Sequence, residues 1–193
     1  YTRSLINIDK AADLFRKLKD LKGLADVTSL FGAIFSLMGN FDKAYSYYKG
    51  ALELRKKVGV PEDIVKSLNS LGDYLMRRKK YAQALKILEE AVSIEHGNEM
   101  FKGIVLYNIS EVHYHLDKLD VAEEYLEQCK AIGEKLKFPL MKVYSYWLQG
   151  RIDIKRGDLD LALERLHEAL NEARAIKARE RFYNILAELA EAY

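Results

Sequence analysis

The feature that most constrains this sequence is a motif that recurs four times at a nearly fixed spacing. In each copy a small residue lies twelve positions before an alanine, and successive alanines are 40, 38 and 40 positions apart. The four pairs are Gly32 and Ala44, Gly72 and Ala84, Ser110 and Ala122, and Gly150 and Ala162. A period in this range indicates an array of stacked repeats, each of which contacts mainly its neighbours.

Each copy predicts two helices that approach each other closely. A small residue on the first helix and an alanine on the second remove bulk that would hold the backbones apart, and a larger residue would cost about 1–3 kcal/mol by overpacking. A large apolar residue follows each alanine by four positions and another small residue follows by seven, so all three lie on one stripe of a helix. These residues are Tyr48, Leu88, Leu126 and Leu166, then Ala51, Ala91, Cys129 and Ala169. The pattern therefore predicts an all-α fold.

This pattern resembles the tetratricopeptide repeat (TPR), whose signature is W-x2-L-G-x2-Y followed by A-x3-F and A. The resemblance extends over essentially all 193 residues, although the period of about 40 is typical of a longer-repeat branch of the family. It implies a right-handed superhelical solenoid of antiparallel helix pairs. The fourth copy departs most from the signature, because Gln149 and Asp153 occupy its leucine and tyrosine positions.

The repeat register gives the expected domain organisation, a single TPR array over residues 1–193. Residues 1–20 correspond to the second helix of a preceding repeat, and residues 179–193 to the first helix of a following one. Full repeats are expected over 22–57, 62–95, 99–136 and 140–176.

The two end helices are expected to have no repeat to cover their apolar stripes. Such exposed patches favour association, so we expect end-to-end self-association of the chain. The stripes comprise Leu5, Ile8, Ala12 and Phe15 at one end, and Ile185, Leu186 and Leu189 at the other.

Charge and composition narrow the classes of partner. Lysine and arginine number 31 and aspartate and glutamate 29, which gives a formal net charge of +2. The two signs are interspersed, so direct binding to nucleic acid or to a membrane is not expected. A single cysteine excludes an internal disulfide, and no run of eighteen apolar residues occurs. We therefore expect a cytoplasmic protein.

The sequence contains no recognisable catalytic motif. A phosphate-binding glycine loop, CxxC, HExxH and a nucleophile elbow are all absent from it. His113 and His115 are two positions apart, which turns them to different sides of a helix. Cys129 occupies a position that holds alanine in the other copies, which favours a buried packing role. We expect neither an enzyme nor a cofactor or metal site.

The resemblance places function on the concave face, which the first helix of each pair lines. Trp147 is either an exposed anchor for a partner or a packing residue, and the sequence leaves both open. The groove residues expected by resemblance are Lys66, Asn69, Asp73, Arg77, Tyr107, Glu111, His115, Tyr144, Trp147, Arg151 and Lys155.

The leading functional hypothesis is a noncatalytic protein-protein interaction scaffold that binds a peptide or partner helix in this groove. The alternative is the ligand-sensing helical region of a bacterial or archaeal signalling or transcriptional regulator.

Overall fold

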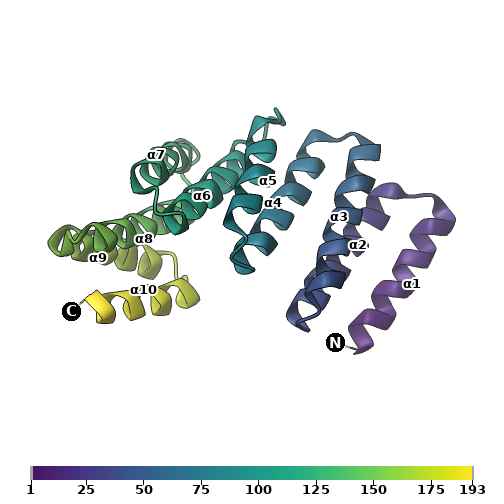
Figure 1. The fold of residues 1–193 in the computed structure, drawn as a ribbon, viewed down its shortest axis with the longest axis horizontal. Coiled ribbons are helices and arrows are strands. Elements are labelled where there is room, and N and C mark those ends of the chain that lie inside the picture. The colour runs from purple at the N-terminus through teal and green to yellow at the C-terminus, as the bar shows by residue number, and fades with distance from the viewer. Residues whose placement is uncertain (1, 193) are drawn as a thin grey trace. The chain divides into compact units, whose positions relative to one another are not determined.

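The computed structural model describes residues 2–192 of the chain, with the side chains of residues 2, 3, 179, 180, 182, 191 and 192 left out. Within that range the chain forms ten α-helices and no strand (Figure 1). They are α1 (Thr2–Leu18), α2 (Leu21–Leu37), α3 (Phe41–Val58), α4 (Pro61–Arg77), α5 (Tyr81–Ser93), α6 (Glu99–His115), α7 (Leu119–Lys135), α8 (Pro139–Arg156), α9 (Leu159–Ala175) and α10 (Arg179–Ala192). The predicted all-α fold class is confirmed. None of the described helices combines the length and apolar character that crossing a membrane requires.

Local sequence explains several of the helix boundaries. Pro61 and Pro139 begin α4 and α8, where the missing backbone N–H would have no intrahelical partner in any case. Gly59 and Gly157 end α3 and α8 in the left-handed conformation, with φ of 79° and 85°. From α1 to α5, and again from α6 to α10, the connections are short and consecutive helices pack as antiparallel neighbours (Figure 1).

The helices group into two compact units, one ending at Gly97 and the other beginning at Asn98, called unit 1 and unit 2 below. In unit 1, α1 to α5 pack against one another in sequence order. In unit 2, α6 pairs with α7, α8 with α9, and α10 packs on α9. The first helices of unit 2 also touch directly, because α8 contacts both α6 and α10.

The recurring small residue makes the close helix approach within each pair. A Cβ added to Gly72 would lie 2.6 Å from a methyl carbon of Leu88, so α4 and α5 could not keep this separation with a larger residue there. Ser110 makes a polar version of the contact, since its hydroxyl donates a 2.6 Å hydrogen bond to the carbonyl of Ala122. Equivalent glycine contacts join Gly32 to Tyr48 and Gly150 to Leu166. The glycine thus meets the large residue four positions after the alanine.

The expectation that the end stripes are uncovered was wrong for most of their residues. Ala12 is fully buried, and Leu5, Ile8 and Phe15 pack with it against α2. At the other end Ile185 and Leu189 are buried against α8 and α9, and only Leu186 is exposed. The reason is that each end helix turns this stripe toward its neighbour inside the same unit.

Candidate interaction surface

The first helices of unit 2 form a surface, here called the wall, from α6 and α8. It comprises Tyr107, Glu111, Tyr114 and His115 of α6 with Tyr144, Trp147, Arg151 and Lys155 of α8. The rings of Tyr107 and Tyr144 meet with centroids 5.2 Å apart. Burial raises the pKa of Tyr107 well above its ordinary value, and the negative charge of Glu111 adds to this effect. Tyr107 is therefore a neutral packing residue at the base of the wall.

Arg151 links three successive first helices. Its guanidinium lies 3.7 Å from a carboxylate oxygen of Glu111 on α6 and 3.5 Å from one of Glu188 on α10. It also lies over the ring of Tyr114, 4.5 Å from the centroid. Only 16% of the Arg151 side chain is exposed, so much of this cation's interaction capacity is used within unit 2.

Lys155 is fixed to the end of α6. Its ammonium group donates to the carbonyl of Tyr114 at 2.8 Å and to a carboxylate oxygen of Asp117 at 3.1 Å. The same nitrogen lies 4.3 Å from the centroid of the Tyr114 ring. Tyr114 thus holds two cations of the wall, Arg151 and Lys155. Because both cations already have carboxylate partners, the wall carries little net positive charge for an acidic ligand.

Trp147 combines features of the two interpretations that the sequence left open. The residue is partly exposed, yet it packs against the buried cluster that α8, α9 and α10 share. Its indole nitrogen is buried, and no acceptor among the described residues reaches it. A Trp147→Ala change would therefore disturb the packing of unit 2 as well as the wall.

Of the remaining predicted groove residues, one lies in unit 2 and four lie in unit 1. His115 is exposed at the end of α6 and meets the Tyr114 ring edge-on, with centroids 5.2 Å apart. Lys66, Asn69, Asp73 and Arg77 all lie on α4 in unit 1. Lys66 pairs with Glu62 at 2.8 Å, and Arg77 with Asp73 at 3.0 Å. The structure thus brings the α6 and α8 residues together in one surface, whereas the α4 residues form a separate row.

Two wall contacts were not predicted from the sequence. Glu188 pairs with Arg151 from 37 positions away, and Asp117 pairs with Lys155 from 38 positions away. Neither carboxylate belongs to the repeat signature. The period itself was the available signal, because residues about 40 positions apart lie on neighbouring first helices.

The irregular fourth repeat is held by polar contacts between α7 and α8. The Gln149 amide donates to Glu123 at 3.0 Å, and the Arg156 guanidinium donates to Glu123 at 2.9 Å and to Asp120 at 2.7 Å. Asp153, at the tyrosine position of the signature, is buried, and one of its carboxylate oxygens has no partner among the described residues. Burial raises the pKa of this carboxyl above the ordinary aspartate value of 3.8; Arg165 opposes the rise and Glu123 adds to it.

Asp153→Asn is expected to raise the free energy of unfolding at pH 7 by about 1 kcal/mol. Because the folded pKa lies above the unfolded one, the wild-type chain loses stability as the pH rises from about 4 through the folded pKa. Asparagine does not titrate, so the advantage of the variant should shrink toward pH 4. Urea unfolding at several pH values measures this, with the exposed Asp9→Asn as control. A constant difference between pH 4 and pH 7 would contradict the assignment.

The candidate reactive groups are packing residues. Cys129 is buried, and burial raises the pKa of its thiol to about 11, which suppresses the reactive thiolate. His113 is buried and its ring stacks on Tyr125, with centroids 5.6 Å apart. Among the described residues no three potential ligands gather as a metal site would need.

Comparison with known protein families decides the classification. The family model described as tetratricopeptide repeat matches residues 23–94 and, in an overlapping copy, residues 63–135. Together these matches span more than half of the chain. The chain belongs to the tetratricopeptide repeat family.

Two curated relatives resemble this TPR chain over most of its length. Outer dynein arm-docking complex subunit 4 of Danio rerio is 21% identical over 186 residues, which cover 92% of this chain and 38% of the relative. A TPR repeat-containing protein of Methanocaldococcus jannaschii is 25% identical over 178 residues, which cover 84% of this chain and 29% of the relative. The chain therefore spans about a third of the length of these relatives.

Solved structures share the fold of the TPR chain at low identity. Aspartyl phosphate phosphatase F of Bacillus subtilis superposes with a TM-score of 0.82 at 18% identity, covering 96% of this chain and 49% of that one. A signal transduction ATPase of Pyrococcus horikoshii with a tetratricopeptide repeat sensor gives 0.80 at 17% identity, covering 96% of this chain and 30% of that one. Both likenesses concern the TPR-type helical-repeat fold.

Proposed function

We propose that this TPR chain is a noncatalytic protein-interaction scaffold, and that the wall of unit 2 holds a peptide or helix of a protein partner. The observation that carries the proposal is the direct contact of first helices α6, α8 and α10, which brings aromatic rings and paired charges from different repeats into one surface. Aromatic and arginine side chains are the groups that interfaces use most for affinity. A second copy of the chain is also proposed as a partner.

The charges of the wall define the partner further. Arg151 and Lys155 already pair with Glu111, Glu188 and Asp117, so a purely acidic peptide would have to displace these carboxylates. A segment with apolar side chains and charges of both signs could bind without displacing all of these carboxylates. Nucleic acid is disfavoured for the same reason, since cations that are already paired attract phosphates weakly.

Peptides selected for binding from a displayed random library test the wall. His115→Ala combined with Lys155→Ala is expected to weaken binding of most selected peptides by about tenfold or more, because both side chains border the exposed part of the wall. Isothermal titration calorimetry would measure the dissociation constants, and circular dichroism would check that helicity is unchanged.

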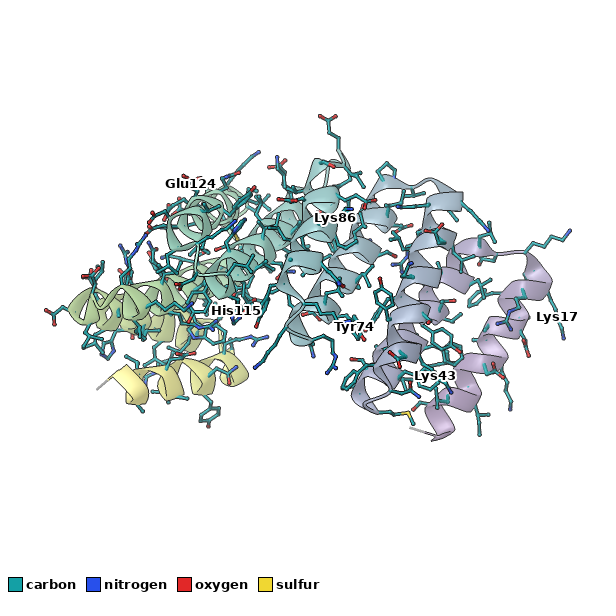
Figure 2. All side chains as sticks on the ribbon, in the orientation of Figure 1. Lys17, Lys43, Tyr74, Lys86, His115 and Glu124 are labelled. Atoms are coloured by element: carbon teal, nitrogen blue, oxygen red, sulfur yellow. The ribbon has the colours of Figure 1, made fainter. Side chains whose placement is uncertain are left out.

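Glu124→Ala provides the matched control. Glu124 is an exposed residue of α7 in the same unit, and Figure 2 shows it and His115 on different sides of that unit. Equal affinities for the wall variant and for the control would place the binding surface elsewhere.

The second candidate function is a ligand-sensing region of a larger regulator. It is favoured by the likeness to the Pyrococcus horikoshii structure, which is named as a signal transduction ATPase with a TPR sensor. A nucleotide-hydrolysing or DNA-binding domain elsewhere in the full-length chain would support this candidate over a free-standing scaffold.

A further inference from the structure

We propose that the turn between α4 and α5 in unit 1 binds a partner segment rich in aspartate and glutamate. Arg77, Arg78, Lys79 and Lys80 follow one another there, are here called the basic turn, and are all exposed. The basic turn belongs to unit 1 and the wall to unit 2, so this inference does not depend on the function proposed for the wall.

The sequence around the basic turn has an excess of positive charge. From Tyr74 to Leu88 it contains five lysines or arginines and no aspartate or glutamate. Residues 1–97 hold 17 basic and 12 acidic side chains, a formal charge of +5, whereas residues 98–193 hold 14 and 17, a formal charge of −3. The corresponding turns of the other three repeats each carry aspartate, namely Asp42, Asp117 with Asp120, and Asp158 with Asp160. The basic turn is therefore a local feature of one repeat that attracts negatively charged groups.

Most cations of the basic turn have no carboxylate partner, in contrast to those of the wall. Arg77 pairs with Asp73 at 3.0 Å. Among the described residues no carboxylate lies within ion-pair distance of Arg78, Lys79 or Lys80. An incoming carboxylate would therefore not have to displace a carboxylate of the chain itself to reach these three cations.

Arg78 is held in a position that leaves its N–H groups available. Its guanidinium lies over the Phe41 ring of α3, 3.7 Å from the centroid, and the Tyr74 hydroxyl donates to the Phe41 carbonyl at 2.7 Å. The backbone of the turn is also fixed, because the amide of Lys80 donates to the carbonyl of Leu75 at 2.9 Å. A planar guanidinium held in this way can bind both oxygens of a carboxylate with little further loss of entropy.

The surroundings of the basic turn favour a peptide over a nucleic acid. Asp73 pairs with Arg77, and Asp42 follows the phenylalanine on which Arg78 lies. A nucleic-acid strand carries a negative charge at every phosphate, so a strand that spans the turn would also approach these two aspartates. A peptide can present carboxylates to the cations and neutral residues to the aspartates.

Fluorescence anisotropy with a labelled peptide tests the site. The probe contains six glutamates between glycines and serines, and a version with glutamine in their place is the neutral reference. Arg78→Gln, Lys79→Gln and Lys80→Gln together are expected to weaken binding of the glutamate peptide by about tenfold or more, at unchanged helicity. No binding of the glutamate peptide at low ionic strength, or equal binding of the glutamine peptide, would overturn the proposal.

A second triple variant controls for net charge. Lys10→Gln, Lys17→Gln and Lys57→Gln remove the same charge from exposed positions on α1 and α3, and they should weaken binding by less than about threefold. If both triple variants lost the same affinity, the peptide would respond to the overall charge and not to the basic turn.

Three further measurements test the details of the site. Arg78→Lys keeps the charge but loses the planar guanidinium, so it is expected to weaken binding by about threefold, and an unchanged affinity would overturn the role given to Arg78. The wall variant, His115→Ala with Lys155→Ala, should bind the glutamate peptide as the wild type does, which separates failure of this site from failure of the wall. A single-stranded oligonucleotide that binds more tightly than the peptide, and that loses affinity in the basic-turn variant, would overturn the choice of a protein partner.

Discussion

Replacing Ala84 with leucine is expected to lower the free energy of unfolding by about 1–3 kcal/mol. Ala84 has no exposed surface, and one turn later Leu88 lies directly against Gly72 of α4. Leucine would add three heavy atoms at a position that has no free space around it, so α4 and α5 would have to shift to accommodate them. The midpoint of urea unfolding, followed by circular dichroism, measures the effect.

Lys86→Leu is the matched control on the same helix. Lys86 is exposed, as Figure 2 shows at its label on α5, so leucine there should change the stability by less than about 0.5 kcal/mol. Equal unfolding midpoints for the two leucine variants would mean that the small-to-alanine motif does not set the contact between the helices.

Arg55→Ala is expected to cost about 2 kcal/mol, because it removes a connection between three helices in which the arginine and its serine partner are buried, whereas its aspartate partner is partly exposed. The Arg55 guanidinium donates to the hydroxyl of Ser67 on α4 at 2.6 Å and to the carboxylate of Asp26 on α2 at 2.7 Å. Only 10% of the Arg55 side chain is exposed. The change would leave the buried Ser67 without this donor and would unpair Asp26.

Arg16→Ala is the control, because it removes an equally short ion pair of an arginine that is exposed and not buried. Arg16 pairs with Asp13 at 2.6 Å, but both side chains are more than half exposed, so the loss should stay below about 0.5 kcal/mol. A double-mutant cycle of Arg55→Ala with Ser67→Ala would isolate the energy of the buried hydrogen bond. If the two arginine variants unfolded at the same urea concentration, the connection through Arg55 would not contribute to the stability of unit 1.

The residues of the wall show which side-chain contacts a periodic pattern can predict and which it cannot. The repeat register puts Glu111 and Arg151 at the same position of adjacent repeats, 40 residues apart, and these two side chains pair between α6 and α8. The register could not predict that Arg151 and Lys155 would both pair with carboxylates of unit 2. That depends on side-chain conformation and on Glu188, which comes from the next helix.

The sequence by itself determined the class of fold, the pairing of helices and the contact between them. Pairs such as Gly72 and Ala84 predict the contact, because only small residues allow two helices to approach so closely. The fixed period repeats this contact along the chain and so predicts the helix pairing and the fold class. The tertiary structure alone decided which apolar stripes are covered and which charges remain available. Phe15 and Leu14 are neighbours on α1, yet the first packs on α2 and the second is exposed. That difference depends on the direction from which the next helix approaches, which is a property of the packed units.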